Sequence, residues 1–137
     1  MTVFHRYLGA LIIGLFIVMM VWTLVLRIMG REQAPVGVWA TQHWTENLLI
    51  LQTVTGIVLL LMGYRTTATP DAWLHYLYGS LFPLVAIVAG RITGMRRENR
   101  EYMGLMWGAF FALALTLRAL QTACGESFAA MGRCLGL

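Results

Sequence analysis

Four stretches of this sequence contain no Asp, Glu, Lys or Arg and are long enough, or nearly long enough, to cross a lipid bilayer as helices. They cover residues 7–26, 47–64, 72–90 and 102–117. A hydrocarbon core needs about 20 helical residues, and the shortest stretch can continue past Arg118 towards Thr122 because an arginine side chain reaches outward to the interface. We therefore predict one transmembrane domain over residues 1–137. Its spans are predicted at about 7–28, 44–64, 71–91 and 102–122, followed by a short C-terminal tail.

The composition excludes several other classes of protein. Apolar residues make up 59% of the chain and charged residues only 12%, which is too few to cover a water-facing surface, so the exterior must largely face lipid. The lack of polar tracts excludes a disordered chain. Nucleic acid is excluded as a partner because the ten basic residues, all arginines, form no basic face. Short connections favour antiparallel neighbours, so the predicted fold is an all-α, integral membrane four-helix up-down bundle.

The arginines also predict an orientation. Six lie after the first span or around the link between the third and fourth spans, against four on the other side. Because cytoplasmic loops carry the excess of Arg and Lys, both termini are predicted to lie outside, in a bacterial inner (plasma) membrane. The first stretch is too long for a signal peptide and has no small-residue cleavage site before Arg27, so we expect a retained helix.

Two connections carry local structural signals. Residues 30–43 contain glycine and proline together with Val and Trp side chains, and we expect this connection to lie in the membrane interface. Thr69, Pro70 and Asp71 combine a good N-cap residue, a proline suited to the first helical position and an acidic residue near the positive end of a helix. This pattern predicts that the third helix starts near Pro70.

Cys124 and Cys134 both lie in the predicted tail on the outer side. An oxidising compartment would allow a disulfide across the nine intervening residues, which would fix an otherwise loose tail. Two free thiols at a membrane edge are the alternative. The sequence leaves both states open.

A short repeat opens the first and third spans. His5 is followed four residues later by Gly9, and His75 is followed four residues later by Gly79. Because alternate helices of an up-down bundle run in the same direction, both imidazoles are expected at one end of the bundle. Each glycine lies on the same helical face as its histidine and leaves room for a flat macrocycle. The pattern predicts that His5 and His75 are the two axial ligands of a haem b; interfacial anchoring and close helix packing are the alternatives.

Three arginines are expected at the level of this histidine pair. Arg6, Arg65 and Arg118 fall on the predicted outer side. A haem there would present two propionates, and arginine pairs with carboxylates through two parallel hydrogen bonds. Arginine is also common at membrane edges, so these residues only support the predicted site.

The third histidine, His43, begins the second span at the opposite end, so it cannot share a metal with the other two. With Glu46 and Asn47 it could form a proton-entry or quinone-head-group cluster, although an interfacial anchor is the more ordinary role. Glu46 needs a partner, and Arg27 and Arg91 end their helices on the same side, which predicts an ion pair. The span's other polar or small residues are expected to face neighbouring helices; these are Thr45, Gln52, Thr55 and Gly56.

Three segments resemble the heme A synthase family. HRYLGALIIGLFIVMMVWTLVLR is similar to that family's haem-ligating helix, LQTVTGIVLLLMG to the helix after it, and LHYLYGSLFPLVAIVAGR to its next histidine-bearing helix. The resemblance covers about residues 5–91 and implies half of such a protein, a four-helix module for b-type haem with His5 and His75 at the matching positions. That family has a Glu four residues before its first ligand, where this chain has Met1, whereas Asp71 holds the same offset before His75.

The expected function follows from the predicted ligation of the haem iron by His5 and His75. With both axial positions filled by protein there is no open site for oxygen, so we expect electron transfer as a subunit of a respiratory or photosynthetic complex and not an enzyme on its own. The expected partners are membrane lipid, other membrane subunits and a quinone. A cofactor-free accessory subunit is the competing hypothesis.

Overall fold

A computed structural model of the 137-residue chain describes residues 2–31, 33–66, 70–96 and 101–135, and over these residues it contains helices and no strand. In chain order the helices are α1 (Thr2–Ile28), α2 (Val36–Leu61), α3 (Leu74–Tyr76), the π-helical turn η1 (Leu77–Leu81), α4 (Phe82–Met95), α5 (Glu101–Cys124) and α6 (Phe128–Leu135). The prediction of an all-α fold is confirmed.

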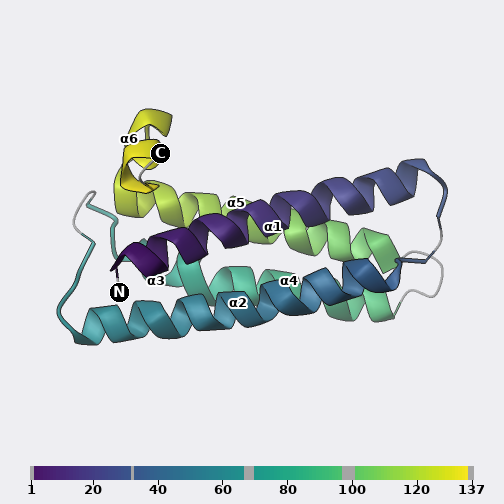
Figure 1. Ribbon diagram of the computed structural model, residues 1–137, viewed down its shortest axis with the longest axis horizontal. Coiled ribbons are helices and arrows are strands. Elements are labelled where there is room, and N and C mark those ends of the chain that lie inside the picture. Colours follow the sequence, from purple (N-terminus) through teal and green to yellow (C-terminus); the bar gives the residue numbers. More distant parts are fainter. Residues whose placement is uncertain (1, 32, 67–69, 97–100, 136–137) are drawn as a thin grey trace.

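Four long rods lie side by side and alternate in direction (Figure 1). They are α1, α2, the continuous helix formed by α3, η1 and α4, and α5, and each is long and apolar enough to cross a membrane. α1 packs against α2 and α5, and α4 packs against the same two helices. Both termini lie at one end of the bundle, where α6 stands at a steep angle to the end of α5 (Figure 1). The extension of the fourth helix past Arg118 is confirmed, because α5 ends at Cys124.

The connection between α1 and α2 is shorter than predicted. Residues 36–43, expected in the connection 30–43, are helical, because α2 begins at Val36 after an extended Pro35 (φ −64°, ψ 156°) whose carbonyl accepts the Val38 N–H. Gly30 ends α1 at φ +67°, a conformation that glycine adopts without steric cost. The carboxylate of Glu101 accepts hydrogen bonds from the Ala34 N–H and the Trp39 indole at 3.2 Å each, which ties this connection to α5.

The third helix begins later than predicted. The expected start near Pro70 is instead a turn, in which the N–H groups of Leu74, His75 and Tyr76 each bond to the carbonyl three residues earlier. Such i→i−3 bonds form a tighter turn than an α-helix, and regular helix starts at Leu74. The proposed N-cap, Thr69, lies outside the described residues.

The π-helical turn η1 has a physical cause in Pro83. A proline inside a helix lacks the N–H that would bond four residues back, and its ring clashes with that carbonyl. Here the chain widens just before Pro83, and the Phe82 N–H bonds to the Leu77 carbonyl five residues back. The Ser80 hydroxyl donates to the Tyr76 carbonyl within the same turn. Turns of this kind are frequent at functional sites.

Glycines bring α4 and α5 into backbone contact. A Cβ atom on Gly90 would lie 2.6 Å from the Cα of Gly108 and 2.7 Å from the carbonyl oxygen of Gly104. Small residues at such a seam allow the close packing that joins helices in lipid. The centre of the bundle is filled by fully buried apolar side chains; these are Ile12, Phe16, Met19, Leu49, Ile87, Ala109 and Ala112.

The predicted tail is folded. The disulfide between Cys124 and Cys134 is formed, with a Cα–Cα distance of 5.7 Å, and it joins α6 to the end of α5. Gly125 makes the turn between the two helices at φ +101°. Met131 of α6 is buried, and the Arg6 guanidinium donates to the Cys134 carbonyl at 3.0 Å. α6 is therefore held against both α5 and α1.

Candidate functional site

The structure brings His5 and His75 together. His5 lies near the start of α1 and His75 lies in α3, and their ring centroids are 6.3 Å apart with an angle of 72° between the ring planes. The two helices belong to rods that each pack on α2 and α5, so the histidines approach each other from opposite corners of the bundle. This is the juxtaposition that the repeat predicts.

The two imidazoles line a cavity of about 410 Å³ at the end of the bundle that carries both termini. Gly9 and Gly79 line it as well, and Cys124 and Cys134 contribute to its wall. The surface of the cavity is mostly apolar, and its larger aliphatic side chains are Ile12, Ile13, Ile57, Leu59, Leu60 and Leu120. A mostly apolar cavity with a few convergent polar groups is typical of a cofactor or ligand site.

His75 has a fixed hydrogen-bond partner. Its Nδ1 lies 2.9 Å from the carbonyl oxygen of Ala119 on α5. Because a carbonyl can only accept, Nδ1 carries the proton and donates, which leaves the lone pair on Nε2. A ring nitrogen held in this way is the usual second contact of a metal-binding histidine.

His5 has a different partner. Its Nε2 lies 3.2 Å from Nε2 of Gln52 on α2. Because the amide nitrogen only donates, Nε2 of His5 accepts, so Nδ1 carries the proton. Within the described residues, His5 Nδ1 and Gln52 Oε1 are buried and have no hydrogen-bond partner. The two contacting side chains thus leave one donor and one acceptor unused.

Glycines on α1 and α2 make room for this contact from both sides. A Cβ on Gly56 would lie 3.3 Å from Cε1 of His5, and a Cβ on Gly9 would lie 3.1 Å from Nε2 of Gln52. The sequence predicts only that Gln52 and Gly56 face neighbouring helices, and it does not predict their part in the site. The signal that could have found them is their spacing of four residues, which repeats the histidine–glycine spacing on an antiparallel neighbour.

The three predicted arginines do not behave alike. Arg6 and Arg65 line the cavity. Arg118 does not line it; its guanidinium contacts Gln121 at 3.3 Å and Glu126 at 4.0 Å on the exposed surface. Two of the three arginines therefore line the cavity, and the guanidinium of one of them, Arg6, donates to the Cys134 carbonyl.

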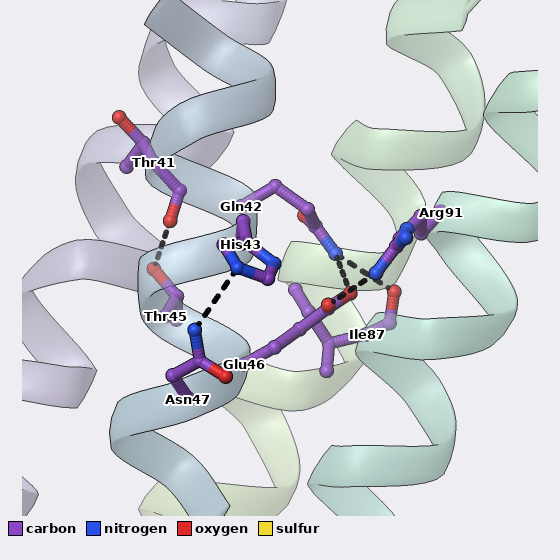
Figure 2. Close-up of polar contacts among 8 residues, drawn as sticks. All are labelled: Thr41, Gln42, His43, Thr45, Glu46, Asn47, Ile87 and Arg91. Atoms are coloured by element: carbon purple, nitrogen blue, oxygen red, sulfur yellow. Dashed lines mark hydrogen bonds and ion pairs between the residues drawn. The ribbon is translucent and has the colours of Figure 1, made fainter.

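A second polar cluster lies between α2 and α4 (Figure 2). Arg91 donates to Glu46 at 2.8 Å, and Gln42 donates to Glu46 at 2.9 Å and to the Ile87 carbonyl at 3.0 Å. The predicted ion pair for Glu46 is confirmed, with Arg91 as the partner. His43 instead contacts Asn47 at 3.2 Å, and both side chains are exposed (Figure 2). The alternative of a cluster of His43, Glu46 and Asn47 is therefore contradicted, because the Glu46 carboxylate is held by other groups.

The described residues contain no group of three or more His, Cys, Asp or Glu side chains that could hold a metal ion. Protein-family models, curated proteins and solved structures give no match to the chain. The resemblance to the heme A synthase family therefore stays a prediction.

Proposed function

We propose that the chain is an integral membrane protein that holds one haem b between His5 and His75 and passes electrons as a b-type-cytochrome-like subunit of a respiratory or photosynthetic complex. Within this proposal the chain lies in a bacterial inner membrane with both termini outside. The observation that carries it is the approach of the two rings to 6.3 Å across one cavity.

The distance between the rings suits a single metal. Two imidazoles that bind one metal from opposite sides at about 2 Å each place their ring centroids about 6 Å apart. The chain offers only these two imidazoles at the cavity among its described residues. A bare ion would need further protein ligands, whereas a metal that brings four ligands of its own needs no more than two. This donor set favours a metallated macrocycle.

The cavity's other residues fit the same group. Gly79 leaves space beside His75 and Gly9 leaves space beside Gln52, and the largely apolar surface of the cavity suits a large apolar ring system. Arg6 and Arg65 line the cavity, and within this proposal they would pair with the two haem carboxylates. Haem supplies one-electron oxidation and reduction when bound. His5 and His75 would hold the group, and the apolar surface of the cavity would keep water from it.

Membrane insertion is supported by the outward faces of the helices. Large apolar side chains are exposed along all four rods, for example Ile17 at 44%, Val54 at 51%, Val85 at 58% and Phe111 at 53%. A soluble monomer rarely exposes apolar surface so continuously. Glu46, the buried carboxylate of α2, is neutralised by Arg91, as expected for a charge at membrane depth.

Absorption spectroscopy of the purified protein tests the proposal. We expect a Soret band and a reducible alpha band typical of six-coordinate low-spin haem. His5→Ala and His75→Ala should each give a high-spin or empty protein, and His43→Ala is the matched control that should keep the wild-type spectrum. A colourless wild-type protein after haem supplementation would contradict the proposal and favour a cofactor-free accessory subunit.

A further inference from the structure

We propose that Gln52 is the positioning residue for His5, and that its amide exchanges one ring nitrogen for the other when His5 binds a metal. In the metal-free protein the Gln52 amide donates to Nε2 of His5; in the loaded protein Gln52 Oε1 accepts from the Nδ1–H group. This inference rests on the proposed function and deepens it.

The unused hydrogen-bonding groups carry the argument. Buried polar atoms without a partner are rare in native structures, and each needs an explanation. Here His5 Nδ1 and Gln52 Oε1 are both buried and unpartnered, yet they belong to side chains already in contact at 3.2 Å. One is a donor and the other an acceptor, so each could satisfy the other. The arrangement in the structure satisfies neither.

The two histidines are prepared differently for a metal. The Ala119 carbonyl holds the Nδ1–H of His75 and leaves the lone pair on Nε2 available. The lone pair of His5 is instead occupied by the Gln52 amide. A metal at Nε2 of His5 must displace that amide, and the buried Nδ1–H still needs an acceptor. Gln52 Oε1 is an unpartnered acceptor, and it belongs to the same amide group that contacts the His5 ring.

The two glycines make the exchange sterically possible. Gly9 presents no side chain to the Gln52 amide, which lies 3.1 Å from where a Cβ would be, and Gly56 presents none to the His5 ring, which lies 3.3 Å from the corresponding position. Each of these side chains can therefore rotate without meeting a Cβ atom of the glycine beside it. The space beside Gly9, expected to receive the macrocycle alone, is shared with Gln52.

The exchange has a measurable electronic consequence. An acceptor at Nδ1–H fixes the ring's tautomer and makes the imidazole a stronger electron donor to its metal. Hydrogen bonding of this kind is one of the factors that set the reduction potential of a haem. Gln52→Leu removes the acceptor and should shift the midpoint potential to a more positive value. Gln52→Glu supplies a stronger acceptor and should shift it to a more negative value.

Two measurements on the full chain in detergent test the inference. In metal-free protein, histidine ¹⁵N chemical shifts should change for His5 and not for His75 in Gln52→Leu. In haem-loaded protein, potentiometric titration should give opposite shifts for Gln52→Leu and Gln52→Glu. Gln121→Leu is the matched control, because Gln121 contacts Arg118 on the surface and does not line the cavity. It should change neither readout.

The outcomes separate this inference from the proposed function. A protein that binds haem through His5 and His75 but has the same midpoint potential in wild type, Gln52→Leu and Gln52→Glu overturns the exchange alone. A wild-type protein that takes up no haem overturns both. If Gln52→Leu fails to fold, Gln52→Glu keeps the length and polarity of the side chain, and an unshifted potential in that variant overturns the exchange.

Discussion

At the scale of single residues, each histidine ring and the Gln52 amide at this end of the bundle packs against a glycine, which has no side chain to obstruct it. His5 lies against Gly56, Gln52 lies against Gly9, and His75 lies beside its own Gly79. A four-residue spacing puts two side chains on one helical face. On α1 and α2, the short motif of each helix therefore supplies one polar group and the space for the polar group of the other helix, whereas Gly79 makes space for the histidine of its own helix.

The glycines should be needed for the cofactor more than for the fold. In Gly79→Leu the new side chain enters the cavity, since a Cβ there already lies 3.5 Å from Ala119 and 3.7 Å from the His75 ring. We expect haem per folded protein to fall several-fold, because a branched side chain would occupy space needed by the macrocycle. Gly9→Leu should act in the same way. The ratio is measured from the pyridine haemochromogen spectrum and the protein concentration.

Gly14→Leu is the matched control for these variants. Gly14 is exposed on α1, and a Cβ there would meet nothing within 4 Å. Its haem content should equal that of wild type. Full haem occupancy in Gly79→Leu and Gly9→Leu would show that these glycines serve helix packing and not the cofactor.

The sequence predicts some of the site's residues and not others. His5 and His75 could be found because the same short motif occurs on two helices that run in the same direction. The Ala119 contact could not be found, because a backbone carbonyl leaves no trace in residue type. The role of Gln52 depends on the rotation of α2 against α1, which hydrophobicity fixes only to within a broad face.

At the scale of helices, the contact between α4 and α5 should be the least tolerant of added volume. In Gly90→Ala the new Cβ would lie 2.6 Å from the Gly108 Cα, and backbone atoms cannot move aside as a flexible side chain can. We expect a loss of about 1–3 kcal/mol of stability from overpacking. Thermal unfolding in detergent measures it. Gly14→Ala, which adds the same methyl group in open space, should unfold at or above the wild-type temperature; equal melting of the two variants would argue against the close seam.

The disulfide should control α6 and leave the four long helices in place. Reduction, or Cys124→Ser with Cys134→Ser, removes the covalent link between α5 and α6, leaving the Arg6 contact and the buried Met131 to hold the short helix. Helices this short are marginal without tertiary contacts. Trypsin should therefore cleave after Arg133 faster in reduced protein, as followed by mass spectrometry, while the far-ultraviolet circular dichroism changes little. Equal cleavage rates would mean that α6 is held by packing alone.

Hydropathy finds the long helices but not their local geometry. Four apolar stretches are enough to predict four rods, because only a helix satisfies its own backbone in lipid. The start of α2 at Val36 could not be predicted, because Val and Trp side chains are common both in a membrane interface and in a helix. The signal for the π-helical turn is Pro83, which lies inside an apolar stretch that by hydropathy alone predicts a regular helix.

At the scale of the whole molecule, the polar groups form two separate sites. The histidine cavity lies at the end with both termini. Glu46 and Arg91 lie further along the bundle, and the fully buried Ile12, Phe16 and Met19 belong to the apolar core. Within the proposed function, the histidine site therefore works from the end of the bundle that carries both termini.

The orientation of the bundle decides which compartment that side faces, and cysteine labelling tests it. The six-to-four arginine count predicts that the end with both termini is outside. In a background with Cys124→Ser and Cys134→Ser, single cysteines are placed at Thr2, Asp71 and Arg96 and probed with a membrane-impermeant thiol reagent on spheroplasts. Labelling is expected at positions 2 and 71, which flank the histidine cavity, and only after lysis at position 96. The inverse pattern would reverse the orientation but keep the paired histidines on one side. Labelling of only one of positions 2 and 71 would contradict the four-span topology, because the two histidines would then face different compartments.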